Sequence, residues 1–395
     1  MKYKIKDLLS SIVDNRGKTP PLANDGYVLI EINAIASKKK NPDYSVIKKR
    51  VSKEVYDSWF RSGHPQKGDI LIPTVGTLDA IAYMDRNDCC IAQNLISFRT
   101  NPKICNSEYL FYLLCDPNIR KKLLNLDIGG VQPSIKVPHL KDLEVDIPSL
   151  NIQHKIATVL SSLDNKIAVN TVINENLEQQ AQALSDKWVA EHLDCISMRP
   201  LVEVAEINPD TYSPKDKWAF VNYLDTSSIT NGIISDIQLI NPDTEKLPSR
   251  ARRIIKANDI VYSTVRPNQL HFGIISNPLD NMLASTGFAV IRSKYDYISS
   301  PYIYHFLISP DFIEKMQQLA EQSTSTFPSV KPSDIGTCLI PCADETEMLD
   351  ISDKINGMYA MVSANRQENK RLADLRDTLL PKLMNGEIDV SVVKI

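Results

Sequence analysis

Two stretches of the chain carry apolar side chains at alternating spacings of four and three residues, the seven-residue rhythm of paired helices. The positions of the first are Ile156, Leu160, Leu163, Ile167, Asn170, Asn174, Leu177, Ala181, Leu184 and Trp188. Those of the second, each 195 residues further on (351 minus 156), are Ile351, Ile355, Met358, Val362, Asn365, Asn369, Leu372, Arg376, Leu379 and Leu383. The pattern predicts two long helices, after Pro148 and after Pro341. One such helix would favour packing on its own domain, but two matched helices favour pairing with each other.

Two asparagines interrupt the apolar positions of each predicted helix. The first helix leads away from the N-terminal region and the second must return, so a pair of these helices should be antiparallel. With pseudo-twofold symmetry, facing residue numbers have a constant sum, and a sum of 539 sets Asn170 against Asn369 and Asn174 against Asn365. The same sum leaves one further polar position, Arg376. A shift by one heptad would leave amides unpaired at about 1 to 3 kcal/mol each, so the asparagines are predicted to fix register and direction.

The regions outside the helices also repeat. The stretch "GDILIPTVG" from Gly68 aligns with "NDIVYSTVR" from Asn258, and "SEYLFYLLCDPNIRKKL" from Ser107 aligns with "SPYIYHFLISPDFIEKM" from Ser300. A shorter match pairs "QPSIK", ending at Lys136, with "FPSVK", ending at Lys331. Each unit begins with short β-rich runs and continues with one short helix, at residues 109–124 or 302–319. The chain is therefore predicted to be one mixed unit, duplicated.

The predicted fold class is α+β, with two α/β domains joined by a two-helix antiparallel coiled coil and a pseudo-twofold internal repeat. The expected boundaries are 1–148 for the first domain, 149–194 for the first helix, 195–342 for the second domain, and 343–395 for the second helix and tail. A helix of about 35 residues spans on the order of 50 Å, more than the roughly 34 Å of one duplex turn. Such a molecule could read two separated half-sites, which need not be palindromic because the two domains differ.

Composition narrows the class of protein. With 43% apolar residues the chain can bury a sizeable core, and its net charge of −3 argues against a wholly basic surface. No apolar run reaches the roughly 18 residues that a membrane helix needs. The seven cysteines form no CxxC pair, which predicts neither a disulfide framework nor a zinc site. We expect a cytoplasmic protein that is not bound to a membrane.

The sequence contains only incomplete versions of known catalytic motifs. The stretch "NPDY" has Asp43 where the Asn-Pro-Pro-Tyr pocket of amino-methyltransferases has its second proline, and no glycine-rich cofactor loop precedes it. "GKT" at Gly17 lacks the first P-loop glycine, since Ile12 stands there. The six histidines have no metal-ligand spacing. We predict no catalytic residue, no metal and no cofactor.

The duplicated domains, the "GDILI" run, the helix "SLDNKIAVNTVINENLEQQAQAL" and the terminal "RLADLRDTLLPKLMNGEI" resemble the specificity subunit of type I restriction-modification systems. The resemblance covers nearly the whole chain. It implies two target recognition domains, each reading one half of a bipartite asymmetric DNA site, and a helical spacer that sets the gap. It also implies that two methyltransferase (modification) subunits dock on the spacer, and that a separate motor-nuclease (restriction) subunit completes the complex. Catalysis and S-adenosylmethionine would belong to the modification subunit.

Candidate DNA-contacting residues lie in the repeated polar loops and in basic clusters. Arginine and amide side chains can address guanine and adenine edges, and basic clusters suit phosphates. The loop candidates are Thr74, Thr77, Gln132, Ser134, Lys136, Thr264, Arg266, Asn268, Gln269, Ser329 and Lys331. The phosphate candidates are Lys48, Lys49, Arg50, Arg250, Arg252 and Arg253, with Lys18 in "RGKTP", which resembles a family segment opening the first domain. An ordinary solvated surface is the alternative for each of them.

Two other functions remain open at this stage. One is a DNA-modifying enzyme with an unrecognised active site, and the other is a scaffold whose repeated domains bind proteins. An activity assay with and without added methyltransferase subunits separates the enzyme from the recognition subunit. Binding to double-stranded DNA separates the scaffold from both.

Overall fold

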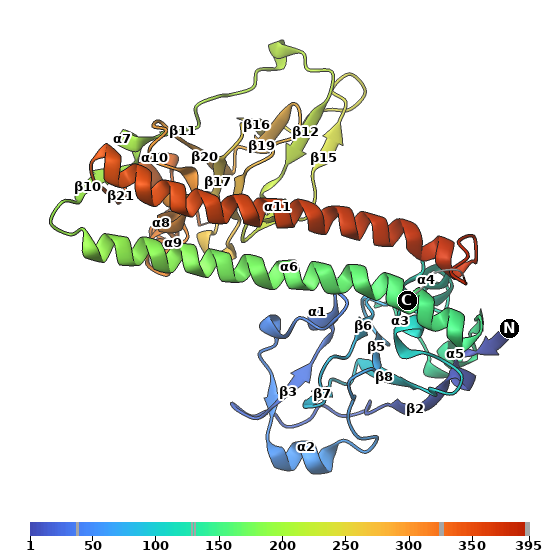
Figure 1. Ribbon diagram of the computed structural model, residues 1–395. Helices are drawn as coiled ribbons and strands as arrows, with labels where there is room; N and C mark the ends of the chain where they lie inside the picture. The colour runs from blue at the N-terminus through green and yellow to red at the C-terminus, as the bar shows by residue number, and fades with distance from the viewer. Residues whose placement is uncertain (37–38, 128, 130–131, 324–327, 392–395) are drawn as a thin grey trace. The chain divides into compact units, whose positions relative to one another are not determined.

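The computed structural model describes residues 1–36, 39–127, 129, 132–323 and 328–391 (Figure 1). The chain divides into two compact units. The first unit comprises residues 1–169 together with 368–395, and the second unit comprises residues 170–367. Both divisions fall inside the long helices, so each unit consists of one α/β domain and the helix segments that flank it.

The first unit is built on a four-stranded antiparallel sheet. Its order is β2 (Leu9–Val13), β8 (Leu95–Thr100), β5 (Ile70–Pro73) and β6 (Ala82–Tyr83). A second sheet has the order β4 (Arg50–Val51), β3 (Tyr27–Ile30) and β7 (Cys89–Ile91), in which β3 and β7 are parallel. The strands β1 (Lys2–Lys4) and β9 (Glu144–Asp146) pair separately. The helices are η1 (Ile5–Leu8), α1 (Ile32–Ile35), η2 (Tyr44–Val46), α2 (Lys53–Trp59), α3 (Ser107–Cys115), α4 (Pro117–Leu124) and α5 (Val137–Asp142).

The second unit has corresponding sheets. The four-stranded antiparallel sheet has the order β11 (Ala205–Ile207), β20 (Phe288–Ser293), β17 (Asp259–Ser263) and β18 (Phe272–Ile275). The next sheet has the order β15 (Gln238–Ile240), β12 (Val221–Leu224), β19 (Met282–Ser285) and β16 (Ala251–Ile254), and β12 and β19 are parallel. Two antiparallel pairs join β10 (Ser197–Pro200) to β21 (Leu339–Cys342), and β13 (Ile229–Thr230) to β14 (Ile233–Ile234). The short helices are α7 (Leu201–Val204), η3 (Pro214–Asp216), η4 (Thr226–Ser228), η5 (Pro267–Gln269), α8 (Ser300–Leu307), α9 (Pro310–Glu321) and α10 (Pro332–Gly336).

The two long helices are α6 (Leu150–Glu191) and α11 (Glu345–Met384), with 42 and 40 residues. This confirms the two long helices that the heptad spacing predicts. Within the first unit, Asp164 contacts Arg376 at 2.6 Å and Lys166 contacts Glu368 at 3.5 Å. Residue numbers therefore rise along one segment as they fall along the other, so the two segments run antiparallel within this unit.

The second unit has the same helix direction. Asn365 Nδ2 donates a hydrogen bond to Asn174 Oδ1 at 2.9 Å, and His192 Nε2 lies 3.3 Å from Glu347 Oε2. Between these two contacts the residue number rises from 174 to 192 on one side and falls from 365 to 347 on the other. The helix segments 170–191 and 345–367 are thus antiparallel inside this unit.

The apolar positions of the long helices also pack on the domains. In the first unit, Ile156 and Leu160 of α6 and Leu380 of α11 belong to the same buried cluster as Phe98 and Tyr109. In the second unit, Ala181, Trp188, Ile351 and Ile355 share a cluster with the strand residues Ile260 and Tyr262. These heptad positions therefore contribute to the cores of the two domains.

The single short helix expected in each domain is wrong, because each is two helices. In the first unit α3 ends at Cys115 and α4 begins at Pro117, with Asp116 between them. Proline has no N–H to continue the first helix, and Asp116 Oδ1 caps the second by accepting from the backbone N–H groups of Asn118 (2.9 Å) and Ile119 (3.2 Å). Ser309 and Pro310 break α8 from α9 in the same way in the second unit.

Within the described ranges, no helix combines the length and the apolar character that crossing a bilayer requires.

Candidate nucleic-acid interface

The two loops that the sequence singles out in the first unit lie side by side. The backbone N–H of Ile135 donates to the carbonyl of Thr74 at 2.9 Å, and the N–H of Gly76 donates to the carbonyl of Pro133 at 2.9 Å. Val75 and Ser134 form an isolated antiparallel bridge between these bonds. The loop after β5 and the loop before α5 therefore form one short two-stranded ladder.

The same ladder occurs in the second unit. The N–H of Val330 donates to the carbonyl of Thr264 at 2.9 Å, and the N–H of Arg266 donates to the carbonyl of Pro328 at 3.0 Å. Val265 and Ser329 form the bridge. Two sequence motifs that repeat along the chain thus meet at matching places in both units.

The ladders divide the candidate side chains into outward and inward groups. The exposed ones are Thr77, Gln132 and Lys136 in the first unit and Arg266, Asn268, Gln269 and Lys331 in the second. Ser134 and Ser329 are half-buried. Thr74 and Thr264 are buried, and their Oγ1 atoms donate to the carbonyls of Asn94 (3.2 Å) and Gly287 (2.9 Å). The two threonines hold the loops in place, and their contact with a base stays a prediction.

The loop of the second unit has a strained tip. Arg266 and Leu270, on either side of η5, have φ of 47° and 58°, in the left-handed region that non-glycine residues seldom adopt. The matching position in the first unit is Gly76, with φ of 91°. Strain of this kind costs about 1 to 3 kcal/mol and is concentrated at functional sites. Here it sets the backbone from which Arg266, Asn268 and Gln269 project.

A pair of buried ion pairs supports the strands that lead into these loops. Arg99 of β8 donates through Nε and Nη2 to the two carboxylate oxygens of Asp69, at 3.0 and 2.8 Å. Arg292 of β20 does the same to Asp259, at 2.7 Å for both bonds. The hydrogen bonds that Arg292 donates to Asp259 raise the pKa of Arg292 against the opposing effect of burial. Sequence reasoning missed these pairs, although the aspartates stand in the repeated "GD" and "ND" dipeptides.

The basic residues expected at phosphates have unequal surroundings in the first unit. Lys48 is exposed, whereas Lys49 pairs with Glu31 at 2.7 Å and Arg50 donates to the carbonyl of Gly26 at 3.0 Å. Lys18 is exposed in the segment after β2.

The arginine cluster of the second unit is also divided. Arg250 is exposed, while Arg252 is half-buried and its Nε donates to the carbonyl of Ser249 at 3.3 Å. Arg253 is half-buried in β16, and burial lowers its pKa. Lys256 pairs with Asp210 at 2.9 Å. Arg250 is therefore the most accessible of the three arginines.

Comparisons with known proteins agree with this geometry. Residues 1–179 match the family model described as the type I restriction modification DNA specificity domain. The chain is 23% identical to the HindI specificity subunit of Haemophilus influenzae, with 82% of this chain and 87% of that protein covered. These matches confirm the resemblance to specificity subunits of type I restriction-modification systems that the sequence predicts. It is also 24% identical to the MjaIX specificity subunit of Methanocaldococcus jannaschii, with 72% and 69% covered.

The fold of this chain is similar to that of a solved structure. The crystal structure of the type I restriction-modification S subunit from M. genitalium matches with a TM-score of 0.60 at 16% sequence identity, over 97% of this chain and 95% of that one. Both the repeated domains and the long helices fall within the matched region.

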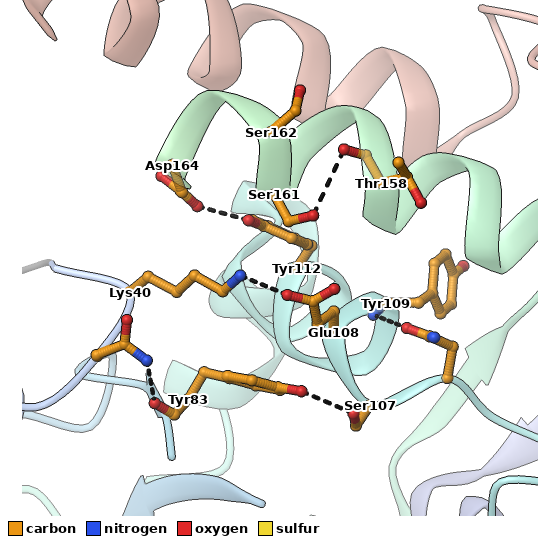
Figure 2. Close-up of polar contacts among 12 residues, drawn as sticks. Lys40, Tyr83, Ser107, Glu108, Tyr109, Tyr112, Thr158, Ser161, Ser162 and Asp164 are labelled. Atoms are coloured by element: carbon orange, nitrogen blue, oxygen red, sulfur yellow. Dashed lines mark hydrogen bonds and ion pairs between the residues drawn. The ribbon is translucent and has the colours of Figure 1, made fainter. Parts of the chain in front are cut away.

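Where the first domain meets its helices, a polar network is buried. Tyr112 of α3 donates to Asp164 Oδ2 at 2.6 Å, as Figure 2 shows, and Arg376 of α11 donates to Asp164 Oδ1 at 2.6 Å. Nearby, Lys40 pairs with Glu108 at 2.5 Å. Burial raises the pKa of Tyr112, and the carboxylate of Asp164 raises it further. A cavity of about 280 Å³ borders this network.

The corresponding place in the second unit is neutral. His305 of α8 aligns with Tyr112 (112 plus 193), and its Nδ1 lies 3.0 Å from Gln182 Oε1 of α6. The imidazole is 1% exposed, and burial lowers its pKa to about 4. Its ring meets the ring of Tyr359 edge-on, with centroids 5.4 Å apart. The imidazole is therefore uncharged at neutral pH.

Among the residues that the structure describes, no three histidine, cysteine, aspartate or glutamate side chains are placed to hold a metal ion.

Proposed function

We propose that each domain of this specificity subunit reads one half of a bipartite, asymmetric DNA site. The observation that carries the proposal is the loop ladder, which occurs once in each unit with different exposed side chains on the same backbone frame. A repeated frame suits a repeated task, and different side chains suit different bases. The target recognition domains would be residues 1–148 and 195–342, followed by helical segments 149–194 and 343–395.

The side chains proposed to meet DNA are the exposed members of the predicted set. Base edges would be addressed by Arg266, Asn268 and Gln269 in the second domain, since arginine suits guanine and amides suit adenine. Thr77 and Gln132 would serve in the first domain. Phosphate contacts would come from the exposed cations, which are Lys18, Lys48, Lys136, Arg250 and Lys331.

We further propose that α6 and α11 form one antiparallel coiled coil that sets the gap between the half-sites. Support comes from the antiparallel course of the helices inside each unit and from the bond between Asn365 and Asn174. Asn170 and Asn369 would form the second polar layer of the same register. Two methyltransferase subunits would dock on this spacer, and a motor-nuclease subunit would join the complex. The chain itself would be non-catalytic and without a cofactor.

The test is methylation of DNA by this chain reconstituted with its modification subunits. Arg266→Ala should lower preference at one half of the motif by about 1 to 3 kcal/mol, if Arg266 makes a bidentate base contact, and leave the other half unchanged. Equal loss of preference in both halves would contradict the assignment. Methylation by this chain alone would instead favour an enzyme with an unrecognised site, and a complex stable only with one modification subunit would contradict the proposed stoichiometry.

The ruler is tested separately by inserting one heptad into each long helix at matching points. Because one whole heptad is added to each helix, the heptad positions of the two helices still face each other. The spacer lengthens by about 10 Å, at 1.5 Å per residue. Both half-sites should keep their bases while the preferred gap changes. Substrates whose gap varies by single base pairs report the result, and an unchanged gap in a folded, active variant would exclude the helices as the ruler.

A further inference from the structure

The strained loop of the second unit needs support from outside itself. Neither Arg266 nor Leu270 relieves its left-handed backbone by being glycine. The residues between them form η5, in which Pro267 is buried while Asn268 and Gln269 are exposed. Without an external contact such a tip would sample other conformations, and its side chains would lose their fixed directions.

Helix α9 provides contacts before, within and after this tip. Phe312 meets Tyr262 of β17 edge-on, with ring centroids 5.8 Å apart. In the middle, the backbone N–H of Asn268 donates to Gln317 Oε1 at 3.3 Å. After the tip, Leu270 packs against the cluster that contains the buried Met316. The helix therefore supports the loop along its length.

Gln317 is itself held in position. Its Nε2 donates to Glu321 Oε1 at 2.8 Å, one turn further along α9. This leaves Oε1 directed to the loop and fixes which end of the amide faces Asn268. The other polar residue beside it, Gln318, donates to Glu314 at 3.1 Å.

The first unit is built differently at this place. Its corresponding helix, α4, has 8 residues where α9 has 12. Leu124, which aligns with Gln317 (317 minus 193), is the last residue of α4 and is 46% exposed. The first loop instead has Gly76 at the left-handed position and its own buried anchor, Leu78. Support from the neighbouring helix is thus a feature of the second domain.

We infer that Gln317 is a positioning residue for recognition of the second half-site, acting through the backbone of Asn268. This inference rests on the proposed function of the loop. Gln317 would not touch DNA; it would hold the tip so that Arg266, Asn268 and Gln269 keep their directions. Its loss should therefore relax base preference without changing the number of phosphate contacts.

The experiment uses the full chain in complex with its modification subunits and DNA substrates that carry every base at each position of both half-sites. Gln317→Met keeps the length of the side chain but removes its amide. It should lower preference in the second half-site about three- to tenfold, as expected for one hydrogen bond. The first half-site and the salt dependence of DNA binding should be unchanged. Gln317→Ala serves as a second variant should Gln317→Met fail to fold.

The rescue variant combines Gln317→Glu with Glu321→Gln. It keeps the net charge, returns an acceptor to Asn268 and restores the bond within α9, so preference should recover. Gln318→Ala and Leu124→Ala are the matched controls and should have no effect on either half-site.

Arg266→Ala is measured in parallel, so that a failure of the inference about Gln317 can be told apart from a failure of the proposed function. A relaxed second half-site with Arg266→Ala but not with Gln317→Met overturns the inference and leaves the proposed function intact. No change with either variant overturns both the inference and the assignment of the loop. Equal relaxation of both half-sites by Gln317→Met, or failure of the rescue variant to recover, also overturns the inference.

Discussion

The two units join a similar domain to similar helices with different chemistry. In the first unit the junction is charged, because Asp164 accepts from both Tyr112 and Arg376. In the second unit the aligned positions hold Tyr359 in place of Asp164 and Ala181 in place of Arg376, and neither of these side chains is charged. The fold tolerates either solution because the surrounding apolar cluster supplies most of the burial. A repeated backbone therefore does not require repeated side-chain chemistry.

The largest expected effect follows from removing the acceptor of the charged junction. Asp164→Ala leaves Arg376 and Tyr112 without their shared partner where little water reaches, which should lower the free energy of unfolding by about 3 to 4 kcal/mol. Chemical denaturation measures it. Asp377→Ala is the matched control, because that carboxylate also contacts Arg376 but is 65% exposed. It should change the free energy of unfolding by less than about 1 kcal/mol. Equal effects from Asp164→Ala and Asp377→Ala would contradict the prediction that the buried carboxylate matters more.

The neutral junction should be sensitive to acid. The pKa of His305 is about 4 in the folded chain, below the ordinary value of 6.5. The unfolded state therefore takes up the proton first, and stability falls as the pH drops from 6.5 towards 4 and is flat above. At pH 4.5 protonation of His305 in the unfolded state should have lowered the free energy of unfolding by about 2.5 kcal/mol. His305→Gln should remove it, so the difference between variant and parent must depend on pH; a constant difference would contradict the prediction.

A smaller effect is expected for the asparagines that the two long helices carry at matching heptad positions. Replacing Asn170, Asn174, Asn365 and Asn369 with leucine exchanges amides for apolar side chains and should raise the free energy of unfolding by about 2 kcal/mol. Other registers or oligomers should then appear. Denaturation and solution mass measure the two outcomes. A less stable variant with one register would show that the asparagines do not trade stability for specificity.

The smallest effect concerns the strained loop. Arg266→Gly gives the second unit the residue that the first has at Gly76, and relief of the left-handed backbone should raise the free energy of unfolding by about 0.5 to 1 kcal/mol. Preference in the second half-site should fall at the same time. Gly76→Ala is the opposite change, since a Cβ there lies 3.2 Å from Ile32 Cδ1 on a backbone with φ of 91°. It should destabilise the first unit.

The sequence predicts best what depends on local spacing. The heptad positions predict both long helices, and α6 begins at Leu150, two residues after the predicted boundary at Pro148. The repeated motifs indicate which loops matter, because duplication preserves them. Pro117 is the local signal for the break between α3 and α4, but the apolar pattern runs through it and favours one continuous helix.

Contacts between distant segments could not be predicted from the same patterns. Thr74 is buried because its hydroxyl reaches the carbonyl of Asn94 on a neighbouring turn, and no local signal distinguishes it from the exposed Thr77. The bond between Asp69 and Arg99 requires knowing that β5 pairs with β8. The support that Gln317 gives to Asn268 likewise depends on how α9 packs. Each of these follows from tertiary structure rather than from periodicity.

The first unit takes residues from two distant parts of the chain, 1–169 and 368–395, and this has a consequence for synthesis. Its core includes Leu380, Leu383 and Val390, which leave the ribosome after the whole of the second unit. The first domain therefore cannot complete its core until the end of the chain has been synthesised, and part of its apolar surface stays uncovered until then. The second domain can fold as soon as its last residue has been synthesised. This reverses the usual N-terminal-first order of folding during translation. A chaperone that recognises nascent chains would meet the first domain for the longer time.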